Sequence, residues 1–138
     1  MSAQGNTLFA FYDLVVSPVS YDFISFLIVA EEERLALAKD DIHLVIVPFE
    51  NGEGHWNNTQ FGPDHTTWRI NQVILPLAQL LPSISGYTNC SSRDQAREIF
   101  DPERNLVFPR GYTVGNPIER HHTGWSVLAA HQDQNLQH

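Results

Sequence analysis

The stretches LFAFYDLVVSP (residues 8–18) and HLVIVPFE (residues 43–50) decide the fold class of this chain. Each is an apolar run of strand length, and the segment between them places its apolar residues at helical spacing. Two strands joined by a helix in this order pair in parallel, with a right-handed crossover. The first third of the chain therefore predicts a strand, helix, strand unit of a parallel sheet.

Capping residues set the expected limits of the first helix at residues 20–39. Ser20 stands at an N-cap position, and Asp22 lies in the first turn, where the helix dipole favours a negative charge. Lys39 lies at the opposite end, where the dipole favours a positive charge. The charges at both ends thus favour a helix of this length.

The rest of the chain continues the alternation of helices and strands. A helical pattern begins at Thr66, and Pro76 predicts a kink or break in it. We then expect a third strand at residues 86–90, a serine-capped helix at residues 91–100 and a fourth strand at residues 106–108. This order predicts an α/β fold: a Rossmann-like three-layer sandwich with a mostly parallel sheet of about four strands. We expect one domain over residues 1–138, with a frayed polar tail at residues 129–138.

Composition argues against several classes of function. The chain of 138 residues carries 16 acidic and 8 basic residues, and its net charge of −8 repels the backbone of a nucleic acid. No apolar stretch reaches the roughly 18 residues of a membrane span, and the N-terminus has no export signal, so we expect a cytoplasmic protein. A single cysteine, Cys90, excludes an internal disulfide and a cysteine-based zinc site. We expect no metal and no cofactor, because GxGxxG, Walker and GxSxG motifs are absent from the sequence.

Ligands of open parallel sheets bind outside the carboxyl ends of the strands. After the first strand, this rule selects Ser17, Ser20, Tyr21 and Asp22. The two serine hydroxyls could help the start of the helix to hold an anion. The alternative is that both serines only cap the helix and tie the turn.

The same rule selects Arg93 after the third strand, and Arg110 and Tyr112 after the fourth. Arg93 could make a forked contact to a phosphate or carboxylate. The alternative for Arg93 is a surface pair with Asp94 or Glu98.

Two other places on the chain have an unusual pattern. Residues 51–65 are expected to form a long loop, which serves as a binding loop or lid, or has no role. His65 begins the next helix, with Trp68 and Arg69 one turn later, so one side of this helix could face the cleft. Asp13 interrupts the first apolar strand, so its carboxylate must be paired, lie at an edge or face a site.

His121 and His122 open the cluster HHTGW near the C-terminus. Adjacent histidines diverge, which makes them poor joint ligands for one metal. One of them could serve as a base, because histidine titrates near neutral pH. A surface or packing role is the alternative.

Short phrases spread over the chain resemble the first half of bacterial glycosyltransferase-like proteins with two Rossmann-type domains. These phrases are, in order, FYDLVVSPVSYDF (11–23), AEEERLAL (30–37), HLVIVP (43–48), WRINQVILPLAQLLPSISGYTNCSSRDQA (68–96), VFPRGY (107–112) and HHTGW (121–125). The resemblance spans about residues 8–125 and lies in the order of the elements, without a catalytic motif.

The resemblance implies a domain that binds a sugar or sugar-phosphate acceptor in a cleft at the strand C-termini. A second domain would hold a sugar nucleotide and complete a hexosyl transferase, so this chain would be the N-terminal half of a larger protein. Carried over by position, the resemblance makes His122 a candidate base and Asp22 a second candidate catalytic residue. The candidate substrate-binding residues are Ser17, Ser20, Tyr21, Arg93, Arg110 and Tyr112.

Two hypotheses from other classes remain open. A non-catalytic α/β binding or interaction module would pair with a second domain or partner chain through residues 115–128, around Trp125. A small phosphate- or nucleotide-binding protein with flavodoxin-like topology rests on the fold alone.

Overall fold

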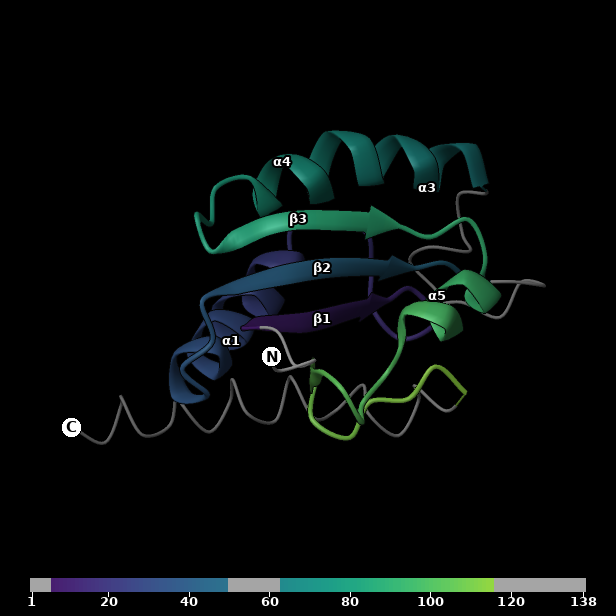
Figure 1. Cartoon of the computed structure of the whole chain (residues 1–138). Helices are drawn as coiled ribbons and strands as arrows, with labels where there is room; N and C mark the ends of the chain where they lie inside the picture. The colour runs from purple at the N-terminus through teal and green to yellow at the C-terminus, as the bar shows by residue number, and fades with distance from the viewer. Residues whose placement is uncertain (1–5, 50–62, 116–138) are drawn as a thin grey trace, which may run out of the picture.

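A four-stranded, all-parallel sheet in the order β3-β2-β1-β4 forms the centre of the computed structural model, which describes residues 6–49 and 63–115 (Figure 1). The strands are β1 (Thr7–Asp13), β2 (Asp41–Val47), β3 (Ile84–Asn89) and β4 (Leu106–Phe108). The predicted α/β class and parallel sheet are confirmed. β1 and β2 have a neighbour on both sides, and both are buried from their fourth residue to their last.

Helices lie on both faces of the sheet. On one face lie α1 (Phe23–Ala36) and a helix that runs through α3 (Pro63–Arg69), the π-helical η1 (Ile70–Ile74) and α4 (Leu75–Ala78). On the other face lies α5 (Arg93–Ile99), which connects β3 to β4. After β3 the chain returns past β2 and β1 to place β4 on the far side of β1. The direction of strand addition therefore reverses between β1 and β4, where Rossmann-like sheets bind ligands.

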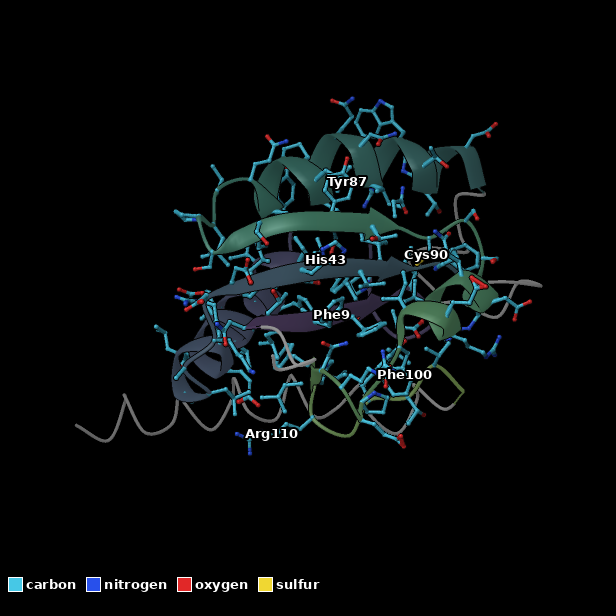
Figure 2. All side chains as sticks on the ribbon, in the orientation of Figure 1. Phe9, His43, Tyr87, Cys90, Phe100 and Arg110 are labelled. Atoms are coloured by element: carbon cyan, nitrogen blue, oxygen red, sulfur yellow. The ribbon has the colours of Figure 1, made fainter. Side chains whose placement is uncertain are left out.

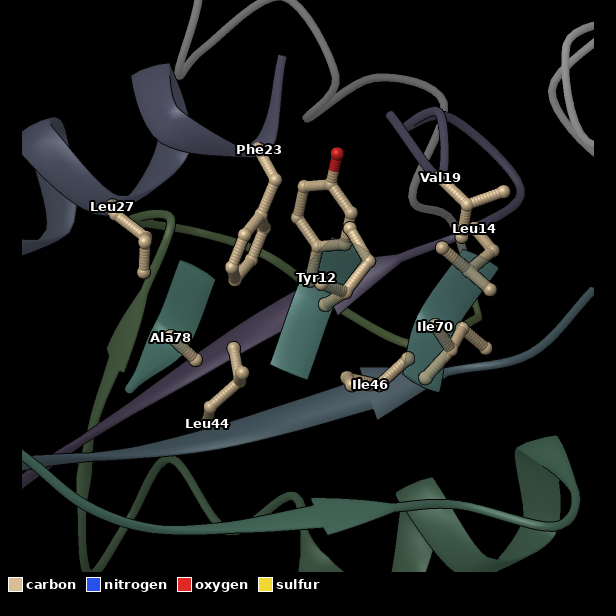
Figure 3. Close-up of a cluster of buried hydrophobic side chains, with 10 residues drawn as sticks. Tyr12, Leu14, Val19, Phe23, Leu27, Leu44, Ile46, Ile70 and Ala78 are labelled. Atoms are coloured by element: carbon tan, nitrogen blue, oxygen red, sulfur yellow. The ribbon is translucent and has the colours of Figure 1, made fainter. Parts of the chain in front are cut away.

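The larger core cluster packs α1, η1 and α4 against β1 and β2 (Figure 3). Tyr12 projects from β1 between the helices and the strands, and its ring meets Phe23 edge-on at a centroid distance of 4.7 Å. Strand residues enter this core at every second position and helix residues at every third or fourth. The cluster consists of Tyr12, Leu14, Val19, Phe23, Leu27, Leu44, Ile46, Ile70, Ile74 and Ala78.

A second core cluster lies between the sheet and α5. Phe11 stacks on Tyr112 at a centroid distance of 5.1 Å and meets Phe100 edge-on at 5.6 Å. Val45 and Val47 of β2 face the same side. This packing fixes the segment that follows β4 against the carboxyl half of β1.

The helix boundaries differ from the sequence prediction in two places. α1 begins at Phe23 rather than at residue 20, because Ser20 accepts the N–H of Asp22 in a separate turn that precedes the helix. The helix ends at Ala36, and Ala38 then has a φ of 56°, which ends the helical path before Lys39. By contrast, the predicted serine cap of α5 is confirmed, since Ser92 Oγ accepts the N–H of Gln95 at 3.1 Å.

Of the kink or break predicted at Pro76, the break does not occur. The chain stays helical through Pro76, and the turn before it widens into η1, whose closing bond runs from the N–H of Leu75 to the carbonyl of Ile70. A proline ring collides with the carbonyl four residues earlier in an α-helix, and a π turn moves that carbonyl away. The expected loop is also shorter at its end, since α3 begins at Pro63.

Within the described ranges, no helix is long and apolar enough to cross a membrane. Residues 129–138 and Trp125, to which the sequence assigns a frayed tail and a docking role, lie outside the described residues.

Candidate functional site

The carboxyl ends of β1, β2 and β3 lie along one edge of the sheet, where their connections begin. β4 does not reach this edge, because its last residue, Phe108, pairs with Ala10 in the middle of β1. The side chains that follow β1, β2 and β3 are therefore the ones that form the carboxyl edge. The segment of residues 14–22 connects β1 to α1 and begins at this edge.

Three hydrogen bonds hold this β1–α1 segment in place. Asp13 Oδ1 accepts the N–H of Val15 at 2.9 Å, and the phenol of Tyr12 donates to the carbonyl of Pro18 at 2.5 Å. Arg69 Nη1 reaches from α3 and donates to the carbonyl of Val19 at 3.1 Å. Burial, together with the negative charge of Asp22, raises the pKa of Tyr12, so this phenol keeps its proton and its bond to Pro18. The segment is thus held in place by side chains of β1 and of α3.

Arg69 also brings His65 close to the β1–α1 segment. Its Nε donates to His65 Nε2 at 2.9 Å, and the imidazole lies nearly parallel to the ring of Trp68 at a centroid distance of 6.2 Å. Because Arg69 binds the carbonyl of Val19, a guanidinium and an imidazole lie next to Ser20. The structure supports the expectation that one side of this helix faces the carboxyl edge.

The candidates of the β1–α1 segment remain together at this edge. Ser17 is half-buried and donates its N–H to the carbonyl of Asp13 at 2.9 Å, while Ser20 accepts the N–H of Asp22 at 3.3 Å. Tyr21 and Asp22 are exposed. Ser20 therefore has the turn-tying role that the sequence left open as its alternative, and it follows Val19, whose carbonyl binds Arg69.

Arg93 has a partner that the sequence did not identify. Its two terminal nitrogens donate to the two carboxylate oxygens of Asp13, each at 2.8 Å, and both side chains are buried. Tyr112 donates its hydroxyl to Asp13 Oδ2 at 2.6 Å. Burial is the main cause of the raised pKa of Tyr112, followed by the negative charge of Asp13. Three residues from the ends of β1, α5 and the segment after β4 thus form one buried network.

Backbone carbonyls bind the remaining sides of this guanidinium. Arg93 Nη1 donates to the carbonyl of Pro48 at 2.9 Å, and Nη2 donates to the carbonyl of Val114 at 2.7 Å. The expected forked contact of Arg93 therefore goes to a carboxylate of the chain itself, and the alternative surface pair with Asp94 or Glu98 is not formed by these nitrogens. Arg93 and Tyr112 thus link structural elements of the chain, and their binding of a substrate stays a prediction.

Arg110 lies away from the carboxyl edge, and this corrects the prediction. It makes an ion pair with Glu33 in the second half of α1, at 2.5 Å between Nε and Oε2. α1 begins at the carboxyl edge and runs away from it, so Glu33 lies about 15 Å along the helix from Phe23 at 1.5 Å per residue. Figure 2 shows Arg110 near the N-terminal ends of the strands, and Cys90 beyond the arrowheads. The physical reason is that β4 ends early, level with Ala10.

His122 lies outside the described residues, so the structure does not place this candidate base. Among the residues that are described, no group of three or more histidine, cysteine, aspartate or glutamate side chains could hold a metal ion. Besides the carboxylate of Asp22, the described residues bring hydroxyls, the guanidinium of Arg69 and the imidazole of His65 to the carboxyl edge. Such groups bind a phosphate or carboxylate through charge-assisted hydrogen bonds.

Comparisons with known proteins found no matching family model, no matching curated protein and no matching solved structure.

Proposed function

We propose that this chain is a binding domain for a sugar or sugar-phosphate acceptor, which it holds at the carboxyl edge of the sheet. The observation that carries the proposal is the contact of Arg69 with the carbonyl of Val19, which brings a cation to the β1–α1 segment. The serine hydroxyls of the same segment are proposed to supply neutral hydrogen-bond donors to a phosphorylated sugar. Arg69 thus takes the role that the sequence assigned to Arg93 and Arg110.

The class of ligand follows from the resemblance to two-domain, glycosyltransferase-like proteins. In such a protein this chain is the acceptor-side domain, and transfer of a hexosyl group requires a second domain. Asp22 is exposed at the same edge, and we propose that its carboxylate contacts the reacting hydroxyl of the acceptor. His122 remains the proposed base.

The experiment that tests this proposal is isothermal titration of the purified chain with glucose 1-phosphate, UDP-glucose and inorganic phosphate. We expect saturable binding that Arg69→Ala weakens by about 10- to 100-fold, the value of one or two hydrogen bonds to a charged group. Arg69→Lys should recover part of the affinity, because it keeps the charge and loses the fork.

Arg97→Ala is the matched control. Arg97 is an exposed arginine on α5 that pairs with Asp94, so its loss removes the same charge from another place. Equal weakening by Arg69→Ala and Arg97→Ala would mean general attraction of anions to the surface. Absence of binding by the unaltered chain would refute the proposal.

A non-catalytic binding or interaction module is the second candidate. The observation that favours it is that two arginines expected in the cleft, Arg93 and Arg110, are bound to carboxylates of the chain itself. A folded chain that binds none of the three ligands is the result that this candidate expects.

A further inference from the structure

An exposed tryptophan lies beside the guanidinium that meets the β1–α1 segment. Trp68 is 58% exposed, although an indole has more apolar surface to bury than almost any other side chain. It directly precedes Arg69, whose Nη1 binds the carbonyl of Val19. Figure 1 shows α3, which contains both residues, toward the arrowhead end of β3. A large apolar ring is thus left at the surface close to the proposed site.

Side-chain contacts along α3 connect this indole to the β1–α1 segment. The ring of Trp68 lies nearly parallel to the imidazole of His65, with an interplanar angle of 25°, and Arg69 Nε donates to His65 Nε2. Residues three and four apart on a helix are neighbours, so these three side chains form one continuous group. The group ends at the carbonyl of Val19, which binds Arg69. The indole therefore has a defined orientation next to the cation of the proposed site.

The neighbours of Trp68 along its side of the helix are polar. Asp64 lies one turn before it and Gln72 one turn after it, and both are exposed. The core of a protein interface is depleted of charged residues, so these neighbours do not suit a protein partner. Carboxylates and amides instead form hydrogen bonds with hydroxyl groups. A pyranose has hydroxyls around its edge and C–H groups on its face, and such C–H groups are attracted to the negative face of an aromatic ring.

Charge sets the direction in which a phosphorylated sugar would lie. The guanidinium of Arg69 attracts a phosphate, whereas the carboxylate of Asp64, on the side of the helix that carries Trp68, repels one. The phosphate is therefore favoured at Arg69 and the neutral ring at Trp68. The two halves of such a ligand would thus be recognised by two adjacent residues of α3.

We propose that Trp68 selects for sugars by stacking its indole against the face of a pyranose ring, while Arg69 binds the phosphate of a phosphorylated sugar. This inference rests on the proposed function and names the residue that recognises the sugar ring itself. A ligand that has the phosphate and no ring, such as glycerol 1-phosphate, gains nothing from Trp68. The difference in affinity between two such ligands is therefore the quantity that Trp68 controls.

Isothermal titration with glucose 1-phosphate and glycerol 1-phosphate tests the inference, because the two ligands share a phosphate monoester and differ in the ring. The unaltered chain is expected to bind glucose 1-phosphate about 3- to 10-fold more tightly, the value of one aromatic contact. Trp68→Ala should remove this preference and leave the affinity for glycerol 1-phosphate unchanged. Trp68→Phe should recover part of the preference, since it keeps an aromatic face. Arg69→Ala, by contrast, should weaken binding of both ligands.

Trp68 is more than half exposed, so its variants should fold, and circular dichroism checks this. Tyr87→Ala is the control variant: it removes another exposed aromatic ring, from β3, and should leave both affinities unchanged. Tryptophan fluorescence gives an independent readout. Glucose 1-phosphate should change the emission of the unaltered chain and leave the emission of Trp68→Phe unchanged.

Equal affinity of the unaltered chain and Trp68→Ala for glucose 1-phosphate would overturn this inference and leave the proposed function standing. So would an equal loss of both ligands in Trp68→Ala, since Trp68 would then act on the phosphate through His65 and Arg69. Tighter binding of uridine 5′-monophosphate than of glucose 1-phosphate would assign the indole to a nucleobase, which also overturns the inference. If the unaltered chain binds none of these ligands, the proposed function fails, and the inference that rests on it fails with it.

Discussion

The network around Asp13 is the most demanding feature at the scale of single residues. Both oxygens of a buried carboxylate are bound, by Arg93 on one side and by Tyr112 and Val15 on the others. A buried ion pair is often no more stabilising than a well-packed apolar pair of similar volume, but removal of one partner leaves a buried charge without compensation. The sequence left open whether Asp13 is paired, lies at an edge or faces a site, and the structure pairs it with a residue that lies 80 positions later.

We expect Asp13→Asn and Arg93→Met each to lower the free energy of unfolding by about 3–5 kcal/mol, and the double variant to lose less than the sum. Urea unfolding followed by circular dichroism measures this. Arg97→Met removes the other arginine of α5, which makes an exposed ion pair, and should change the midpoint little. Similar midpoints for Arg93→Met and Arg97→Met would contradict the role of the network.

Tyr12 and Tyr112 predict how stability depends on alkaline pH. Burial raises the pKa of both phenols above their ordinary value of about 10, so the folded chain keeps protons that the unfolded chain releases. The contribution of the two protonated phenols to the free energy of unfolding is therefore complete below about pH 10. Above that pH the free energy of unfolding declines by about 2.7 kcal/mol per pH unit for the two groups together.

Tyr12→Phe and Tyr112→Phe should each remove about half of that slope in urea unfolding between pH 10 and 11.5. Tyr87→Phe changes an exposed tyrosine of β3 and serves as the control. Because each variant is compared with the unaltered chain, other groups that titrate at alkaline pH cancel. An unchanged slope in both variants would show that these phenols ionise within the folded chain.

At the scale of elements, the sequence predicted correctly those features that depend only on residues close together in the chain. Ser92 caps α5 as expected, because an N-cap bond needs only residues three apart in the sequence. Pro76 shows the limit of this reasoning. Its missing N–H and bulky ring are local facts, but whether the chain breaks or widens depends on the core, which holds Ile70, Ile74 and Ala78 against the sheet. The packing of these residues against the sheet is thus the reason that the helix widens into a π turn and does not break.

The same distinction between local and distant contacts applies to the candidate site. Residues of one continuous segment, such as Ser17 and Ser20, stay together wherever the strand ends, so the sequence predicted their position. The partners of Arg93 and Arg110 lie 80 and 77 positions away, and no local pattern reveals them. Arg110 was misplaced because the register of β4 on β1, rather than the order of strands, sets how far β4 reaches.

At the scale of the whole molecule, alternation of strands and helices predicted a parallel sheet, and the order β3-β2-β1-β4 adds the position of the reversal. β1 and β2 pair with each other along their whole length and each has a second neighbour, whereas β4 pairs with one strand only, through three residues at the edge. Stability should therefore decline from the middle of the sheet outward, since exchange of backbone hydrogens follows local opening.

Hydrogen exchange measured by NMR checks this gradient. We expect the amides of β1 and β2 near Tyr12 and Ile46 to exchange only through global unfolding, and those of β4 to exchange at least about 100-fold faster through local opening.

Arg93→Met should speed exchange at β4 and Tyr112 more than at β3, because Arg93 and Tyr112 both bind Asp13 and tie the segment after β4 to β1. Uniform acceleration across all four strands would mean that the network stabilises the domain as a whole. Equal protection of β4 and β1 in the unaltered chain would refute the gradient, and would place β4 within the same cooperative unit as the centre of the sheet.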